Sequence, residues 1–238
     1  MHAFQREASW FIKKGKFIHF SGINGLSVFY CDYDCLRYSP CLLDEFEVSL
    51  PVKLGDASAK RQAEYLAGRY AAASALKRLG VTSPNISSGK NREPCWPAGI
   101  VGSITHKTTV AASVVAKRGS ANLLGIDYEE WVSYPTFQRI ESRIINQKEH
   151  ALLEMCDYAL EQAFTIAFSA KESLFKALYP SVGRYFGFSA AEVTGISKLN
   201  NSFELTLCET LNPELPKGHR FKGRLLADAD GVLTLIAA

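Results

Sequence analysis

The segment QAFTIAFSAKESLFKALYP, residues 162–180, carries most of its polar side chains on one narrow side of what we expect to be a helix. At about 100° per residue, four of them fall within a strip about 60° wide: Thr165, Ser169, Glu172 and Lys176. A carboxylate confined to such a strip costs free energy unless a cation or a hydrogen-bond donor meets it. Two interpretations remain open, an ordinary ion pair between Glu172 and Lys176 on a solvated face and a functional carboxylate.

Lys171 lies on another side of the same helix, among Phe164, Phe168 and Phe175. A lysine in such a place commonly covers apolar surface with its methylene groups while its ammonium reaches water. From its position alone we interpret Lys171 as a snorkelling lysine.

A second acidic pattern occurs in LLGIDYEEW, residues 123–131, which we expect to be a strand. Because side chains alternate along a strand, Asp127 and Glu129 point to one side and Glu130 to the other. Two like charges on one face repel each other unless water or a cation separates them. Solvent exposure is the simpler explanation. The other is a divalent cation, which prefers oxygen ligands and often bridges carboxylates to phosphates.

The heptapeptide VGSITHK, residues 101–107, brings hydroxyls, an imidazole and an amine to the end of another expected strand. Ser103 and Thr105 share one face of it, and His106 and Lys107 follow at the turn. Such groups hold phosphate oxygens through charge-assisted hydrogen bonds. For the heptapeptide alone, the simpler explanation is an incidental histidine at a polar hairpin end.

Basic residues gather upstream, with Arg61 and Arg69 in the alanine-rich segment 56–80 and Lys90 and Arg92 in the loop after it. Arginine binds phosphate through paired hydrogen bonds, although many arginines on helices only increase solubility.

These side chains need helices and strands to position them. The segment 56–80 is the clearest helix, since Asp56 or Ser58 can cap it and Gly80 can end it. Asn146 and Glu149 have the spacing of a capping box. The further elements that we expect are strands at 25–34, 101–117 (two, joined at 106–109), 123–131, 192–199, 202–209 and 223–238 (with a turn at Asp230–Gly231), helices at about 136–157 and 160–179, and a loop at 82–99.

Each half of the chain therefore combines a substantial helix with a few mostly antiparallel strands. This pattern predicts an α+β protein with an N-terminal half, 1–121, and a C-terminal half, 122–238. A ligand cleft between two such halves would be usual.

Composition excludes several classes of protein. The chain has 238 residues, 47% hydrophobic and 21% charged, with a formal net charge of +3. This mild basicity suits an anionic ligand and is too small for a dedicated nucleic-acid binder. The N-terminal stretch has no apolar core of a signal peptide, and no run is long enough for a membrane helix. We therefore expect a cytoplasmic protein.

The six cysteines are expected to be reduced thiols, as is usual in the cytosol. Cys31, Cys35 and Cys41 are closely spaced, but no matching pair of cysteines or histidines follows at the spacing of a zinc site. We interpret them as thiols of a strand and a loop.

Four segments in register carry a family resemblance: KRQAEYLAGRYAA, REPCWPAGIVGSITHK, LGIDYEE and FSAKESLFKALYP. In this order and spacing they resemble the phosphopantetheinyl transferases of the surfactin and enterobactin type, in particular the bacterial enterobactin-synthase subgroup. They span Lys60 to Pro180, about half of the chain.

The resemblance implies an enzyme that transfers the phosphopantetheine arm of coenzyme A to a serine of an apo acyl or peptidyl carrier protein and releases 3′,5′-ADP. It also implies two pseudo-twofold-related α+β halves, with coenzyme A and Mg²⁺, or Mn²⁺ in its place, bound between them. Siderophore, polyketide and fatty-acid carriers all remain open as acceptors.

Site residues follow from the resemblance by position. Asp127 and Glu129 match the metal-binding DxE, and Glu172 matches the acid of a KE-x-x-x-K helix motif, as a metal ligand or the general base. Lys171 and Lys176 match the two lysines of that motif. Both are expected to contact coenzyme A, and Lys176 is expected to contact its phosphates and stabilise charge during transfer. A metal-bound water is the rival base.

The remaining matches concern coenzyme A. His106 and Thr105 match a polar pair that meets its phosphates, and we expect His106 to stabilise charge during transfer. Arg61 matches a residue that holds the ribose 3′-phosphate, and Arg92 one in the adenine and phosphate loop. The same signature includes Arg69 and Glu64; Arg69 is counted among the residues expected to bind coenzyme A, and no more specific role follows for either.

Two rival classes remain. One is a degenerate homologue that binds coenzyme A or a carrier without transfer, although the acidic set is intact here. The other is a metal-dependent phosphodiesterase that uses the same acids. The expected partners are coenzyme A and a carrier protein, with neither nucleic acid nor membrane, and the expected state is a monomer.

Overall fold

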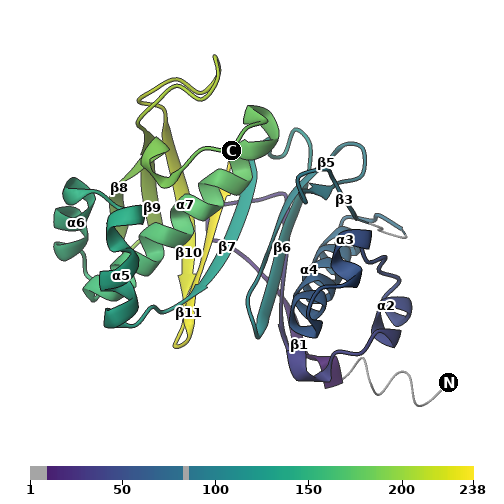
Figure 1. Ribbon diagram of the computed structural model, residues 1–238. Helices are drawn as coiled ribbons and strands as arrows, with labels where there is room; N and C mark the ends of the chain where they lie inside the picture. The colour runs from purple at the N-terminus through teal and green to yellow at the C-terminus, as the bar shows by residue number, and fades with distance from the viewer. Residues whose placement is uncertain (1–9, 83–85) are drawn as a thin grey trace. The chain divides into compact units, whose positions relative to one another are not determined.

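The computed structural model describes residues 10–82 and 86–238 and divides into two compact units, Met1–Asn122 and Leu123–Ala238. Each unit combines antiparallel strands with helices (Figure 1), so the predicted α+β class is confirmed. Part of the N-terminal stretch that we searched for a signal peptide, and part of the predicted loop 82–99, lie outside the described residues. Within the described ranges, no helix is both long and apolar enough to cross a lipid bilayer.

The first unit is built on a four-stranded antiparallel sheet in the order β1-β2-β6-β5. Helix α4 packs against β2, β5 and β6. The strands of this sheet are β1 (Ile12–Ile18), β2 (Leu26–Tyr33), β5 (Ile100–His106) and β6 (Val110–Lys117). A separate two-stranded sheet, β3 (Ser87–Ser88) and β4 (Pro94–Cys95), precedes β5 in the sequence. The helices are η1 (Cys35–Arg37), α2 (Cys41–Glu45), α3 (Val52–Gly55) and α4 (Ala59–Arg78).

Helix α4 begins where the sequence predicts, because the side chain of Ser58 accepts a hydrogen bond from the amide of Arg61 at 3.3 Å. Its buried face consists largely of alanines, among them Ala63, Ala67 and Ala71, which are fully buried. Such small side chains let the helix lie close to the sheet. This close packing brings polar residues of α4 within reach of β5.

The second unit is built on a five-stranded antiparallel sheet in the order β7-β11-β10-β9-β8. Helix α7 packs mainly against β7 and β11. The strands are β7 (Leu124–Glu130), β8 (Ala191–Ser197), β9 (Ser202–Leu207), β10 (Arg220–Ala227) and β11 (Gly231–Ala237). The helices are α5 (Tyr134–Ile144), α6 (Gln147–Glu154), α7 (Leu160–Val182) and η2 (Phe188–Ala190).

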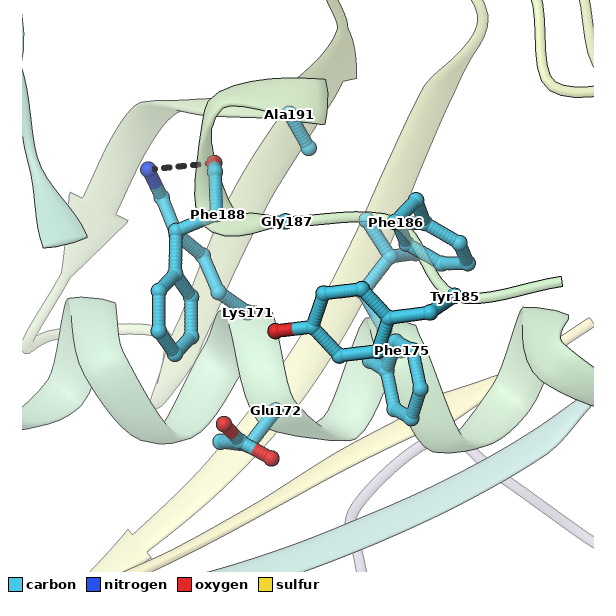
Figure 2. Close-up of a pocket in the computed structure, with 9 residues that line it drawn as sticks. Lys171, Glu172, Phe175, Tyr185, Phe186, Gly187, Phe188 and Ala191 are labelled. Atoms are coloured by element: carbon cyan, nitrogen blue, oxygen red, sulfur yellow. Dashed lines mark hydrogen bonds between the residues drawn. The ribbon is translucent and has the colours of Figure 1, made fainter. Parts of the chain in front are cut away.

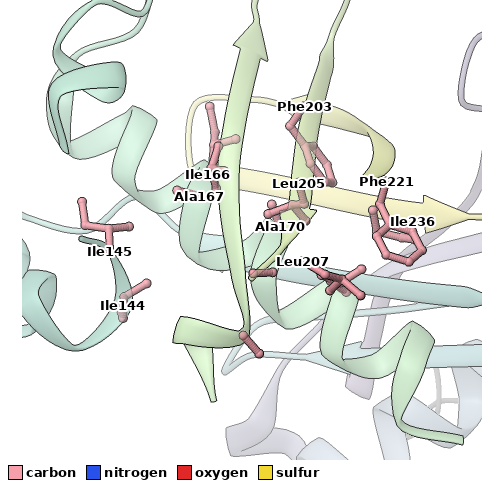
Figure 3. Packing of buried hydrophobic residues seen from close by; sticks show 14 of the residues in the cluster. Ile144, Ile145, Ile166, Ala167, Ala170, Phe203, Leu205, Leu207, Phe221 and Ile236 are labelled. Atoms are coloured by element: carbon pink, nitrogen blue, oxygen red, sulfur yellow. The ribbon is translucent and has the colours of Figure 1, made fainter. Parts of the chain in front are cut away.

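The core of the second unit lies between α7 and the sheet. Figure 3 shows Ile166, Ala167 and Ala170 of α7 beside strand residues such as Phe203 and Leu205. All five are at most 1% exposed. This apolar contact anchors α7 along one side, so that its polar strip has a fixed direction.

Part of the polar strip is buried rather than solvated, while Glu172 and Lys176 stay partly exposed. Ser169 and Ser173 are fully buried and meet Thr234 of β11, with Oγ–Oγ1 distances of 2.8 and 2.7 Å. Strand β7 lies very close to the same side, since a Cβ on Gly125 would come within 1.8 Å of the carbonyl oxygen of Ser173. Glycine at position 125 thus permits the close approach of β7 to α7.

Several details differ from the sequence-based expectations, and the predicted loop 82–99 contains the short strands β3 and β4. The predicted helix 136–157 is two helices, α5 and α6, separated at Ile145–Asn146, where Asn146 and Glu149 form a capping box. The last hairpin turns at Asp228–Asp230, and Gly231 already belongs to β11. Strand β1 was not predicted, because KKGK interrupts its apolar pattern.

None of the six cysteines, all of which lie within the described residues, forms a disulfide bond. Cys31 is fully buried in β2, and burial raises the pKa of its thiol to about 12. Its thiol is therefore unreactive at neutral pH.

Candidate active site

Asp127 is the centre of a polar cluster between β7 and α7. Its carboxylate accepts a hydrogen bond from Ser169 Oγ at 2.9 Å and pairs with the Lys176 ammonium at 2.6 Å. Lys176 also donates to the carbonyl oxygen of Ile126 at 3.2 Å. Asp127 is 4% exposed, so this pairing supplies the positive charge that a buried carboxylate requires.

Glu129 follows on the same side of β7 and is 8% exposed, whereas Glu130 is exposed. The predicted alternation along this strand is therefore found, but the simpler explanation of the acidic pair, solvent exposure, is wrong. Both carboxylates are instead taken largely out of water. Burying two neighbouring acids is costly unless cations or donors compensate it.

Glu172 lies on α7 between the two residues that hold Asp127, three positions after Ser169 and four before Lys176. Residues at these spacings share one helical face. Glu172 is half-buried and also lines a pocket of about 70 Å³. Figure 2 shows the rings of Phe175, Tyr185 and Phe186 at one end of this pocket. A carboxylate thus stands between a charged cluster and an aromatic pocket.

The three predicted acids do not form a ready ligand set. Within residues 10–82 and 86–238, no three carboxylate, imidazole or thiol side chains lie close enough together to hold a metal ion. The chemistry of the donors nevertheless fits a hard divalent cation, which takes oxygen ligands. Asp127 is already in contact with the cationic Lys176, so positive charge is favourable at this position. The site fits Mg²⁺ in the type of its donors and would need a rearrangement of side chains to bind it.

Lys171 differs from both of its expected roles. Its side chain is 3% exposed and forms an ion pair with Glu149, so the snorkelling interpretation is wrong. It also donates to the carbonyl oxygens of Ile144 and Phe188, at 2.7 and 3.1 Å. These three acceptors account for the three N–H donors of the ammonium. In this arrangement the Lys171 ammonium therefore has no N–H group left to donate to coenzyme A, as its predicted contact would require.

The first unit has a separate cluster of charged side chains between α4 and β5. Arg61 Nη1 lies 3.0 Å from Glu64 Oε2 and 3.5 Å from His106 Nε2, and His106 Nδ1 lies 3.9 Å from the same Glu64 oxygen. The Arg61 side chain is 42% exposed. Gly68 leaves room for the imidazole, since a Cβ there would lie 3.4 Å from His106 Cδ2. The structure thus brings Arg61, Glu64 and His106 together, and the Arg61 guanidinium remains partly exposed, so that an anionic ligand can reach it.

Thr105 lies on the other side of β5 from His106. It is 3% exposed and shares its side with the buried Ser103. That Thr105 and His106 both meet the phosphates of coenzyme A stays a prediction.

Arg69 and Arg92 lie at two further places. Arg69 is 7% exposed; it donates to Tyr65 Oη at 3.2 Å and to Ser88 Oγ at 2.9 Å, and its guanidinium lies 4.5 Å from the centre of the Tyr65 ring. It therefore fastens the β3 segment to α4. Arg92 is exposed in the following loop and has a φ of 71°, a left-handed conformation that is unusual for arginine.

Tyr185 and Phe188, which line the pocket beside Glu172, were not among the site residues predicted from the sequence. Glu149 was predicted only as part of a helix cap. The aromatic segment 185–188 could have been noticed as an apolar cluster after the helix. No signal in the sequence links Glu149 to Lys171.

Comparisons with known proteins agree in both units. A family model described as the 4′-phosphopantetheinyl transferase N-terminal domain matches residues 51–116, and one described as the 4′-phosphopantetheinyl transferase superfamily matches residues 123–223. Together they cover more than half of the chain, and they include every site residue predicted above.

Curated relatives point in the same direction. The chain is 39% identical over 154 residues to enterobactin synthase component D of Salmonella typhimurium. The aligned segment covers 64% of this chain and 63% of that protein. It is 44% identical over 126 residues to enterobactin synthase component D of Escherichia coli K12, or 52% of this chain and 58% of that protein. It is 36% identical over 136 residues to 4′-phosphopantetheinyl transferase PptT of Mycobacterium tuberculosis, or 57% of this chain and 59% of that protein. The match thus spans less than two thirds of the length of each of these relatives.

Proposed function

The chain belongs to the 4′-phosphopantetheinyl transferase superfamily, and on that premise we propose that it transfers the 4′-phosphopantetheine arm of coenzyme A to a serine of an apo carrier protein. The observation that carries the proposal is the placement of Glu172 on α7 between Ser169 and Lys176, the two residues that hold Asp127. The Glu172 carboxylate, the Lys176 ammonium and the buried Asp127 carboxylate suit a reaction at a diphosphate in this arrangement.

In the transfer step, the serine Oγ of the carrier attacks the β-phosphorus of coenzyme A. A new bond forms between Oγ and phosphorus, the bond from phosphorus to the bridging oxygen breaks, and 3′,5′-ADP leaves. Glu172 takes the proton of the serine hydroxyl as general base. Lys176 stabilises the negative charge that develops on the phosphate oxygens.

The cluster of Arg61, Glu64 and His106 in the first unit would bind coenzyme A. Arg61 suits the ribose 3′-phosphate, because its guanidinium is charged and partly exposed. His106 lies within 3.5 Å of Arg61 and would hold a further phosphate oxygen. Arg92 would contact the adenine and phosphate region from its loop. Arg69 would act indirectly, by holding the β3 segment through Ser88.

We also propose a divalent metal, Mg²⁺ or Mn²⁺, held by Asp127, Glu129 and Glu172. Such an ion would supply Lewis-acid chemistry and neutralise part of the diphosphate charge. Asp127 would contribute to such a site beside the Lys176 ammonium with which it is paired. The support for this proposal is the burial of two carboxylates on one side of β7.

The acceptor that we propose first is a carrier domain of siderophore synthesis, because several relatives bear the name enterobactin synthase component D. Polyketide and fatty-acid carriers are the alternatives.

The function is tested with the purified chain, coenzyme A, Mg²⁺ and a panel of apo carriers. We expect the intact mass of at least one carrier to increase by one phosphopantetheine group, together with release of 3′,5′-ADP. EDTA should stop the reaction, and added Mg²⁺ or Mn²⁺ should restore it. Hydrolysis of coenzyme A without any carrier would instead indicate a phosphodiesterase, and binding without turnover would indicate a degenerate homologue.

We predict that Arg61→Ala raises the KM for coenzyme A and leaves the use of dephospho-coenzyme A nearly unchanged. The reason is that only coenzyme A carries the 3′-phosphate that Arg61 would bind. Loss of a charge-assisted pair of this kind corresponds to about tenfold or more in KM. Steady-state kinetics with both substrates measures the difference.

A suitable control is Arg78→Ala in the last turn of the same helix, where the guanidinium lies over the Phe17 ring. Arg78→Ala should leave both KM values unchanged. Equal losses with both substrates in Arg61→Ala would contradict the assignment of Arg61 to the 3′-phosphate.

A further inference from the structure

A buried ion pair joins α6 to α7 beside the candidate active site. Lys171 Nζ lies 2.7 Å from Glu149 Oε1, and both side chains are 3% exposed. Burial lowers the pKa of the Lys171 ammonium, and Glu149 opposes that shift. Because two charges lose their hydration in such a pair, a buried ion pair is a poor source of stability. Its presence therefore calls for another explanation.

The two residues connect several parts of the second unit. The Glu149 carboxylate also accepts hydrogen bonds from the amides of Val193 and Asn146, at 2.8 and 3.0 Å. Lys171 donates to the carbonyl oxygens of Ile144 and Phe188. The pair thus links the end of α5, the start of α6, the strand β8, the segment around η2 and the middle of α7.

This network reaches the pocket beside Glu172. Lys171 directly precedes Glu172 on α7, and Phe188 lies in the pocket wall opposite the helix, with Tyr185, Phe186 and Gly187. Figure 2 shows the hydrogen bond from Lys171 to the Phe188 carbonyl across one end of the pocket. It is a direct polar link between the helix that carries Glu172 and the wall that faces it.

We propose that Glu149 and Lys171 are positioning residues that hold the pocket wall 185–191 at a fixed distance from Glu172. The proposal rests on the proposed function, since Glu172 is the base of that reaction. Glu149 holds the Lys171 ammonium where it donates to the Phe188 carbonyl. Lys171 then fixes the wall, and the wall limits where the reacting groups lie relative to Glu172.

Three variants test this: Glu149→Gln, Lys171→Met and the double variant. Each single change leaves one buried charge without its partner, so both should lower the Tm strongly. The double variant removes both charges and should recover much of the Tm. If the pair positions the wall, kcat of the double variant should still fall by about tenfold to 100-fold, because small displacements in an active site have effects of this size. The KM for coenzyme A should change little.

Hydrogen–deuterium exchange gives a readout that does not depend on activity. We expect the amides of residues 183–191 to exchange faster in the double variant than in the wild-type chain, although its Tm has recovered. The control is Lys198→Met, which removes an exposed lysine of the same unit that also donates to a backbone carbonyl, that of Asp157 at 3.2 Å. Lys198→Met should leave Tm, kcat and the exchange of 183–191 unchanged.

The outcomes separate the two proposals. If the wild-type chain transfers nothing, the proposed function fails, and the exchange of 183–191 still decides whether the pair holds the wall. Wild-type exchange in the double variant would overturn the positioning role, and so would faster exchange with a wild-type kcat. If the double variant does not fold, Glu149→Gln is measured at a temperature below its own lowered Tm, and wild-type exchange of 183–191 in that variant overturns the positioning role.

Discussion

Glu172→Gln is expected to abolish carrier modification while the fold survives. The amide keeps the size of the carboxylate but can neither accept the serine proton nor bind a divalent cation as an anion. General bases contribute about 100-fold to 10,000-fold in rate, and we expect kcat to fall by at least this much. Intact-mass kinetics on a carrier that the wild-type chain modifies measures the loss, and the Tm reports the fold.

The matched control is Glu161→Gln, the same change in the first turn of the same helix. It should leave kcat unchanged, because Glu161 lies away from Asp127 and its partners. Transfer at the wild-type rate by a folded Glu172→Gln variant would remove Glu172 from the mechanism.

Gly125→Ala is expected to have the largest effect on stability. The added methyl group would lie 1.8 Å from the carbonyl oxygen of Ser173 and 2.7 Å from the amide nitrogen of Ala177. Both atoms belong to the backbone of α7, so no side chain can turn away to make room. Overpacking costs about 1–3 kcal/mol and occasionally more, and we expect this site at the upper end. Chemical denaturation measures the change in the free energy of unfolding.

Gly195→Ala in β8 is the control, since the nearest atom to its added methyl group is Glu204 Cβ at 3.9 Å. This variant should unfold within about 1 kcal/mol of the wild-type chain. Stability of Gly125→Ala at the wild-type level would show that β7 and α7 can separate without cost. Transfer by Gly125→Ala should fall as well, because β7 carries Asp127 and Glu129.

Much of the fold follows from periodicity, as α4 and α7 illustrate. The cap at Ser58 and the alanines after it define α4 within a few residues. In α7, the apolar Ala167 and Ala170 lie in the core of the second unit, whereas the polar Ser169 and Ser173 also face the sheet, at Thr234. Strand β1 escaped prediction because edge strands with exposed lysines lack an apolar alternation.

The candidate site was less accessible to sequence reasoning. The narrow strip on α7 suggested that Ser169, Glu172 and Lys176 act together, but not that the strip is buried against Thr234. Lys171 shows the limit most clearly. Its partner Glu149 is distant in sequence, and no local pattern shows that a lysine among phenylalanines is paired rather than solvated.

The order of strands in the second unit has a consequence for how the chain folds during synthesis. Strand β11 lies between β7 and β10, although it is made last of the three. As the chain leaves the ribosome, the hydrogen-bonding edge of β7 that pairs with β11 must therefore remain unpaired until β11 emerges. Contacts of such long range slow folding and leave edges open to aggregation. We therefore expect the need for chaperones during expression to be set largely by the late synthesis of β11.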